Sequence, residues 1–177
     1  AKLSNNAYHR METYEEEIPK MIEYIASEEE YYDALKHDLR MLEGEQMSLR
    51  MEARSLKKRQ INIRQSCIIM LACFAVVYCV FLVATIASEN QMNILVFFIV
   101  TVIGAAMALG SFALMRYTRR EVAVTEIKLN KATNLLNKTK IKFVNTSNVL
   151  DYEYTKFRVN DADELSRKYQ CYIEMKA

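Results

Sequence analysis

Two long uncharged stretches constrain this chain more than any other feature. Residues 66–87 contain no Asp, Glu, Lys or Arg, and neither do residues 92–115. The first stretch holds 11 Leu, Ile, Val or Phe residues and the second holds 12. About 20 apolar residues cross the hydrocarbon core of a bilayer. A buried hairpin in a soluble protein is the alternative, but the 127 residues outside 66–115 are too few to cover two helices that are apolar all round.

The short linker and the flanking charges predict the topology. Residues 88–91 permit only a tight antiparallel hairpin, which places both ends of the chain on one side of the membrane. The linker has no Lys or Arg, whereas basic residues flank both stretches; they are Lys57, Lys58, Arg59, Arg64, Arg116, Arg119 and Arg120. The positive-inside bias therefore predicts that both termini are cytoplasmic. Glycosylation-type triplets at Asn137 and Asn145 would favour the opposite side, but such triplets arise often by chance, and the charge bias outweighs them.

The composition favours helices throughout. The chain has three Gly and one Pro, too few for the many turns of a sheet protein. We predict an all-α membrane protein, built as a two-helix transmembrane hairpin with long cytoplasmic coiled-coil arms. Its domains are an N-terminal arm (1–65), the hairpin (66–115, with spans 66–87 and 92–115) and a C-terminal arm (116–177).

The N-terminal arm carries a heptad pattern, in which apolar residues recur at alternating spacings of three and four. This pattern predicts a coiled-coil seam, and its leucines are Leu35, Leu39, Leu42, Leu49 and Leu56. The other positions are Met11, Tyr14, Ile18, Met21, Ile25, Glu28, Tyr32, Gln46, Ala53, Gln60 and Ile63. Pro19 fits a first helical turn, so a short helix is expected before the main one. Gly44 is a hinge or is merely tolerated.

The C-terminal arm repeats the pattern less strictly. Its positions are Val122, Thr125, Leu129, Ala132, Leu136, Thr139, Phe143, Thr146 and Leu150. Asp161 with Glu164 resembles a capping box, and a final helix with Leu165, Tyr169 and Tyr172 on one face should follow. Residues 1–56 have a net charge of −6 and residues 116–142 one of +6, so the arms should pair antiparallel. Tyrosines crowd the far ends of both arms and form either a surface for a protein partner or a half-buried helix face.

The second span has a stripe of small residues, formed by Thr101, Gly104, Ala108 and Ser111. Small residues allow close approach of helix backbones in lipid. The stripe is either an oligomer or pore-lining face, or the surface that packs on the first span. Cys67, Cys73 and Cys79 point in three directions at their spacing of six, and we interpret them as small apolar packing residues.

No residue pattern indicates catalysis, a cofactor or a metal site, and we predict a non-enzymatic protein. The two histidines, His9 and His37, have no metal-ligand spacing. The acidic triplets at 15–17 and 28–30 are predicted to be solvated faces. The basic segment 116–142 lies beside the membrane, so lipid headgroups and the acidic N-terminal arm are its expected partners, and no nucleic acid is expected.

The order of coiled coil, span, short linker, span and coiled coil resembles the layout of the mitochondrial calcium uniporter family. That family has an acidic Trp-Asp…Glu-Pro motif at the start of its second span. The corresponding stretch here, Ser88-Glu89-Asn90-Gln91-Met92-Asn93, contains no Trp and no Pro. The resemblance therefore implies an architecture and not an activity.

These features predict a self-assembling, homo-oligomeric membrane scaffold or subunit of a membrane complex. The alternative is an oligomeric pore or ion channel gated by its cytoplasmic arms. In that case Glu89, the acidic residue of the linker, would form a charged ring at the pore mouth.

Overall fold

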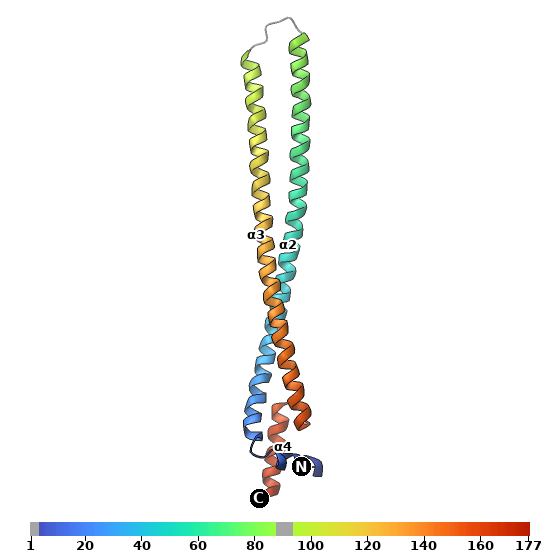
Figure 1. The fold of residues 1–177 in the computed structure, drawn as a ribbon, viewed down its shortest axis with the longest axis vertical. Coiled ribbons are helices and arrows are strands. Elements are labelled where there is room, and N and C mark those ends of the chain that lie inside the picture. Colours follow the sequence, from blue (N-terminus) through green and yellow to red (C-terminus); the bar gives the residue numbers. More distant parts are fainter. Residues whose placement is uncertain (1–3, 88–93) are drawn as a thin grey trace. The chain divides into compact units, whose positions relative to one another are not determined.

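The computed structural model describes residues 4–87 and 94–177, and these residues are almost entirely α-helical. Four helices follow one another along the chain (Figure 1): α1 (Asn5–Thr13), α2 (Ile18–Ala87), α3 (Ile94–Phe157) and α4 (Ala162–Lys176). The all-α prediction is confirmed. α2 includes the apolar stretch 66–87 and α3 includes residues 94–115 of the second stretch, and each helix is long and apolar enough to cross a membrane.

The first helix boundary lies where proline predicts it. α1 ends at Thr13 and α2 begins at Ile18, so Pro19 stands in the first turn of α2, where its missing N–H costs no helical hydrogen bond. The expected short helix before the main one is confirmed. α2 then continues through Gly44, which is exposed, and a Cβ at this residue would meet no atom within 4 Å.

The second boundary joins α3 to α4 through a compact turn. Arg158 adopts a left-handed backbone with φ of 51°. The amide of Val159 donates to the carbonyl of Tyr154 at 3.1 Å, which is the bond that closes a Schellman motif. Asp161 then caps α4, because its Oδ1 accepts from the amide of Glu164 at 2.6 Å. The predicted capping role of Asp161 is confirmed.

The contacts divide the chain into two compact units. We call the first the terminal unit (Ala1–Glu45 with Ala132–Ala177) and the second the span unit (Gln46–Lys131). α2 and α3 contribute segments to both units. Within each unit these two helices lie side by side and run antiparallel (Figure 1).

The terminal unit holds the main hydrophobic core. All four helices contribute to this core or to the turn beside it, and its fully buried side chains include Met11, Ile18, Leu165 and Tyr172. The remaining members are Ile25, Leu150, Phe157, Val159 and Ala162. Leu165 and Tyr172 lie on the buried side of α4 and Tyr169 is half-buried, as the sequence predicted for the final helix.

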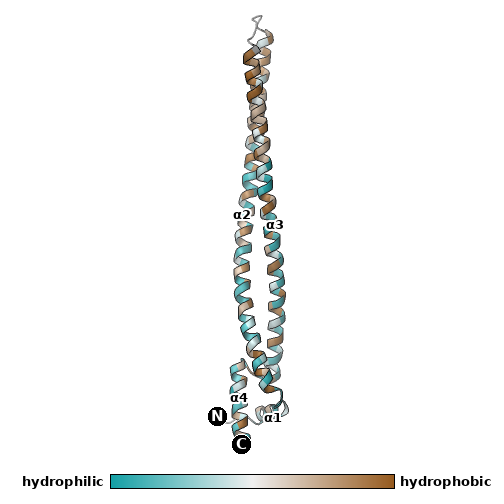
Figure 2. Ribbon diagram, turned by 90° about the vertical axis from the view of Figure 1, so that its left-hand side faces the viewer, coloured by the Kyte–Doolittle hydropathy of each residue, from teal (hydrophilic) through white to brown (hydrophobic). Residues whose placement is uncertain are grey.

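The span unit leaves most of its apolar surface exposed. Only 6% of the most apolar 18-residue window in each long helix is buried inside the chain. The hydrophobic colouring surrounds the helices over these segments, whereas the rest of α2 and α3 alternates between polar and apolar (Figure 2). A core helix of a soluble protein would be mostly buried, so these two helices differ from that case.

Candidate functional site

The predicted seam positions from Ile18 onward lie on the inward faces of α2 and α3, and Met11 and Tyr14 lie in α1 and just after it. Every one of them is buried or half-buried in the structure, for both arms. Leu35 and Leu42 are among the most buried leucines, with 6% and 7% of their surface exposed, and Leu39, Leu49 and Leu56 are half-buried. Tyr32 stacks on Phe143 with ring centroids 4.7 Å apart, so the two seams face each other within the terminal unit.

Ion pairs join the acidic face of α2 to the basic face of α3. Lys140 lies 3.4 Å from Glu43 in the terminal unit, and Lys57 lies 2.7 Å from Glu126 in the span unit. Both pairs are about half exposed, and exposed pairs of this kind contribute little to stability. Their charge pattern instead favours the observed pairing of the helices over others.

Aromatic side chains of the terminal unit pack across helix boundaries. Tyr8 of α1 lies against Tyr172 of α4, with centroids 5.0 Å apart, and Tyr14 meets Phe157 edge-on at 5.7 Å. The tyrosines thus divide into two groups. One is buried or half-buried in this packing, and the other, made up of Tyr24, Tyr31 and Tyr152, is exposed.

Glu29 connects α2 to both sides of the α3–α4 turn. Its Oε1 accepts from the Tyr154 hydroxyl at 2.6 Å and from the Ala162 amide at 2.9 Å. Burial, and then the hydrogen bond to Glu29, raise the pKa of the Tyr154 phenol. The prediction that Glu29 belongs to a solvated face was wrong, because its side chain is half-buried and accepts hydrogen bonds from two residues of the α3–α4 region.

Glu15 forms a second long-range polar contact. Lys176 Nζ donates to its carboxylate at 2.6 Å and the Tyr172 hydroxyl donates at 3.1 Å. The hydrogen bond from Lys176 is the main cause that lowers the pKa of Glu15. Glu15 therefore links the end of α4 to the segment between α1 and α2, which the interpretation as a solvated face did not foresee.

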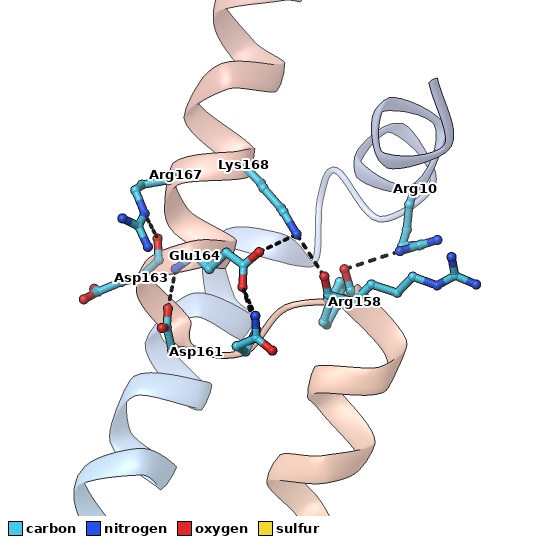
Figure 3. A network of polar contacts seen from close by, with 9 residues as sticks. Arg10, Arg158, Asp161, Asp163, Glu164, Arg167 and Lys168 are labelled. Atoms are coloured by element: carbon cyan, nitrogen blue, oxygen red, sulfur yellow. Dashed lines mark hydrogen bonds and ion pairs between the residues drawn. The ribbon is translucent and has the colours of Figure 1, made fainter. Parts of the chain in front are cut away.

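A polar network surrounds the α3–α4 turn (Figure 3). Lys168 donates to the carbonyl of Arg158 at 2.9 Å and pairs with Glu164 at 2.8 Å. Arg10 donates to the Phe157 carbonyl at 3.5 Å. Arg10 and Lys168 thus bond the carbonyls of Phe157 and Arg158 at the end of α3, and Asp161 and Glu29 bond the amides of Glu164 and Ala162 in the first turn of α4, so the network stabilises the turn between the two helices.

Within residues 4–87 and 94–177, no three His, Cys, Asp or Glu side chains come together as metal ligands. All four cysteines are free thiols; Cys67 is buried, Cys73 and Cys79 are exposed, and Cys171 is half-buried.

The four residues of the small-residue stripe on α3 differ in burial. Gly104 faces α2, where a Cβ would lie 2.6 Å from Cζ of Phe74, and Ser111 is buried. Thr101 and Ala108 are exposed. The stripe therefore contributes to packing between α2 and α3 at two positions and leaves two others exposed. Glu89, the predicted pore-mouth residue, lies outside the described residues.

Two separate hollows lie between α2 and α3, near the ends of the apolar stretches that carry the basic residues. The first has a volume of about 140 Å³ and is lined by Gln60, Arg64, Thr118 and Arg119, with Ile61, Ile63 and Met115. The second has a volume of about 410 Å³, and its lining includes Cys67, Met107 and Gly110. Neither hollow was predicted from the sequence. The sequence feature that could have predicted the second hollow is the small size of Cys67, Gly110 and Ser111, which lie close to the basic residues that flank both apolar stretches.

No protein-family model matches the chain, and no match is found among curated proteins or solved structures.

Proposed function

We propose that this chain is a self-assembling integral membrane scaffold. It spans the bilayer twice, through 66–87 and 92–115, and holds both arms in the cytoplasm as an antiparallel coiled coil. The observation that carries the proposal is the pair of apolar helical segments of which the chain itself buries only 6%. Lipid is the solvent that suits such a surface.

The arms support a structural role and not an enzymatic one. Their heptad positions face inward, and the long-range polar contacts of Glu15 and Glu29 join the helices of the terminal unit. Such an arrangement presents a stable helical surface for assembly. The exposed tyrosines Tyr24, Tyr31 and Tyr152 offer contact area for a protein partner.

Cysteine-accessibility labelling tests the topology. The background replaces Cys67, Cys73, Cys79 and Cys171 by Ala, and single cysteines are then introduced as Ser4→Cys, Ala177→Cys or Asn90→Cys. In intact cells, a membrane-impermeant maleimide should label only Asn90→Cys. After permeabilisation it should label all three, because positions 4 and 177 are exposed.

Two results would contradict the proposal. Labelling of Ser4→Cys and Ala177→Cys from outside intact cells would reverse the topology. A cation conductance of the purified protein in planar bilayers, reduced or reversed by Glu89→Lys, would favour the pore over the scaffold.

A further inference from the structure

We propose that one face of the terminal unit binds the same face of a second copy of this chain, so that α2 and α3 of the two copies form a bundle of four helices. We call it the docking face. Its apolar residues are Tyr24, Tyr31 and Met41 of α2 with Leu135, Val149 and Tyr152 of α3. The inference rests on the proposed self-assembly and names the surface through which the arms associate.

The docking face lies along one flank of the seam between α2 and α3. Tyr31 comes one residue before a seam position of α2, and Val149 comes one residue before a seam position of α3. Residues spaced by seven share a helix face. Glu17 and Lys156 lie at such spacings from Tyr31 and Val149, and they are paired at 3.5 Å. The two helices therefore meet along this flank and present one continuous surface.

The opposite flank is polar and makes contacts within the chain. Glu29 and Glu43 each follow a seam position of α2. The first accepts from the Tyr154 hydroxyl at 2.6 Å, and the second lies 3.4 Å from Lys140. Glu29 also accepts from the first amide of α4, so α4 begins on this flank and not on the docking face.

The docking face leaves large apolar side chains exposed. The exposed fraction of its six apolar residues runs from 37% for Val149 to 66% for Tyr152. Three of the six are tyrosines, which are enriched among the residues that contribute most to protein–protein binding. A continuous apolar patch of this kind on the surface of a folded unit is typical of a contact with another protein.

The proposed membrane topology sets the orientation of the second copy. Both copies leave the same membrane, so their arms point the same way and a two-fold axis along the membrane normal relates them. Because each docking face contains both helices, this axis places α2 of one copy beside α3 of the other. The two neighbours then run antiparallel, as α2 and α3 do within one terminal unit (Figure 1).

Charge complementarity supports a second copy as the occupant. Asp38 of α2 and Lys142 of α3 are exposed on the docking flank and lie at the same level of the unit. The stack of Tyr32 on Phe143 lies on one side of that level, and the ion pair of Glu43 lies on the other. Among the described residues, neither Asp38 nor Lys142 has an ion-pair partner. The two-fold axis preserves the level, so Asp38 of each copy meets Lys142 of the other.

Two valines on opposite flanks of α3 provide the first test. Val149 lies on the docking face, whereas Val144 is exposed on the polar flank, one helical turn after Lys140. Val149→Asp should raise the dissociation constant of the full chain in detergent by about tenfold or more, because it places a charge in an apolar contact. Val144→Asp should leave the constant within about threefold of wild type. Sedimentation over a range of protein concentrations measures both, and circular dichroism checks that both variants fold.

Cross-linking provides a second test that does not depend on Val149→Asp. Two differently tagged forms of the cysteine-free chain are co-expressed, one with Asp38→Cys and the other with Lys142→Cys. A short bismaleimide added to isolated membranes should join one chain of each tag. The matched control replaces Lys142→Cys by Lys140→Cys, which lies at the same level on the polar flank and should give little product.

Two results would overturn the inference. One is a dissociation constant of Val149→Asp equal to that of wild type, which would assign the docking face to a different protein. The other is equal cross-linking of Asp38→Cys to Lys140→Cys and Lys142→Cys. In both cases the wild-type chain would still associate, whereas a chain that stays monomeric at every concentration would contradict the proposed self-assembly itself. The two failures are therefore distinguishable.

Discussion

At the scale of single residues, the carboxylates of the terminal unit have the most specific roles. Glu15 and Glu16 are neighbours in an acidic run, yet only Glu15 meets Tyr172 and Lys176. The sequence could not separate them, because the partners lie 157 and 161 residues away and no local pattern encodes such a distance. By contrast, the cap at Asp161 depends on Glu164, three residues on, and was predictable for that reason.

The lowered pKa of Glu15 predicts how acid affects the terminal unit. The folded-state pKa lies below the ordinary value of 4.5, so the contact contributes stability above that value and loses it as the pH falls through the folded pKa. The melting temperature should therefore fall on acidification from about pH 6 to below about pH 4, as followed by circular dichroism.

Glu15→Gln is the matched variant for that measurement, because it keeps the shape of the side chain and removes its titration. The variant should melt lower than wild type at about pH 6, and the difference should shrink as the pH falls. An equal difference at all pH values would show that the charge of Glu15 has no part in the contact.

At the scale of the elements, burial follows the heptad pattern closely. A spacing of three and four returns to one helix face, so local sequence alone identifies which side of α2 is buried. The start of α2 followed equally from Pro19. The hollow lined by Arg64 and Arg119 did not, since it depends on how two separate helices meet.

Adjacent positions on α2 provide the sharpest test of the seam. Leu42 is 7% exposed and Met41 is 60% exposed. Leu42→Asp should lower the free energy of unfolding by several kcal/mol, because it buries an unpaired carboxylate. Met41→Asp should change it by less than about 0.5 kcal/mol. Urea or thermal unfolding of the full chain in detergent measures both.

The seam interpretation would fail if the two variants behaved alike. Equal stability losses would mean that both sides of α2 are covered, for example by another chain. No loss in either variant would mean that the contact between the arms is not part of the stable state.

At the scale of the whole molecule, assembly depends on the surfaces that a single chain leaves exposed. The sequence predicted one stripe on the second span with two possible partners. In the structure, Gly104 and Ser111 lie toward α2, while Thr101 and Ala108 remain exposed. A sequence pattern cannot divide a stripe in this way, because small residues suit any close neighbour.

We expect Ala108→Leu to shift the protein from oligomer to monomer in detergent, because the larger side chain prevents close approach of a second copy. Multi-angle light scattering gives the mass. Gly104→Leu is the comparison. It should lower the unfolding temperature by disturbing the packing on Phe74, since the added side chain has no room there. A wild-type mass in Ala108→Leu would show that this face is not the oligomer contact.

The core of the terminal unit also has a consequence for synthesis. Met11 and Ile18 pack in one core with Leu165 and Tyr172, which are made much later in synthesis. A ribosome working at ~5–20 residues per second needs roughly 7–30 s to cover the ~150 residues between them. During that interval the apolar face of the N-terminal segment is uncovered. A chaperone or the same segment of a neighbouring nascent chain can bind this apolar face during the interval. Association between nascent chains then competes with folding of each chain's own terminal unit.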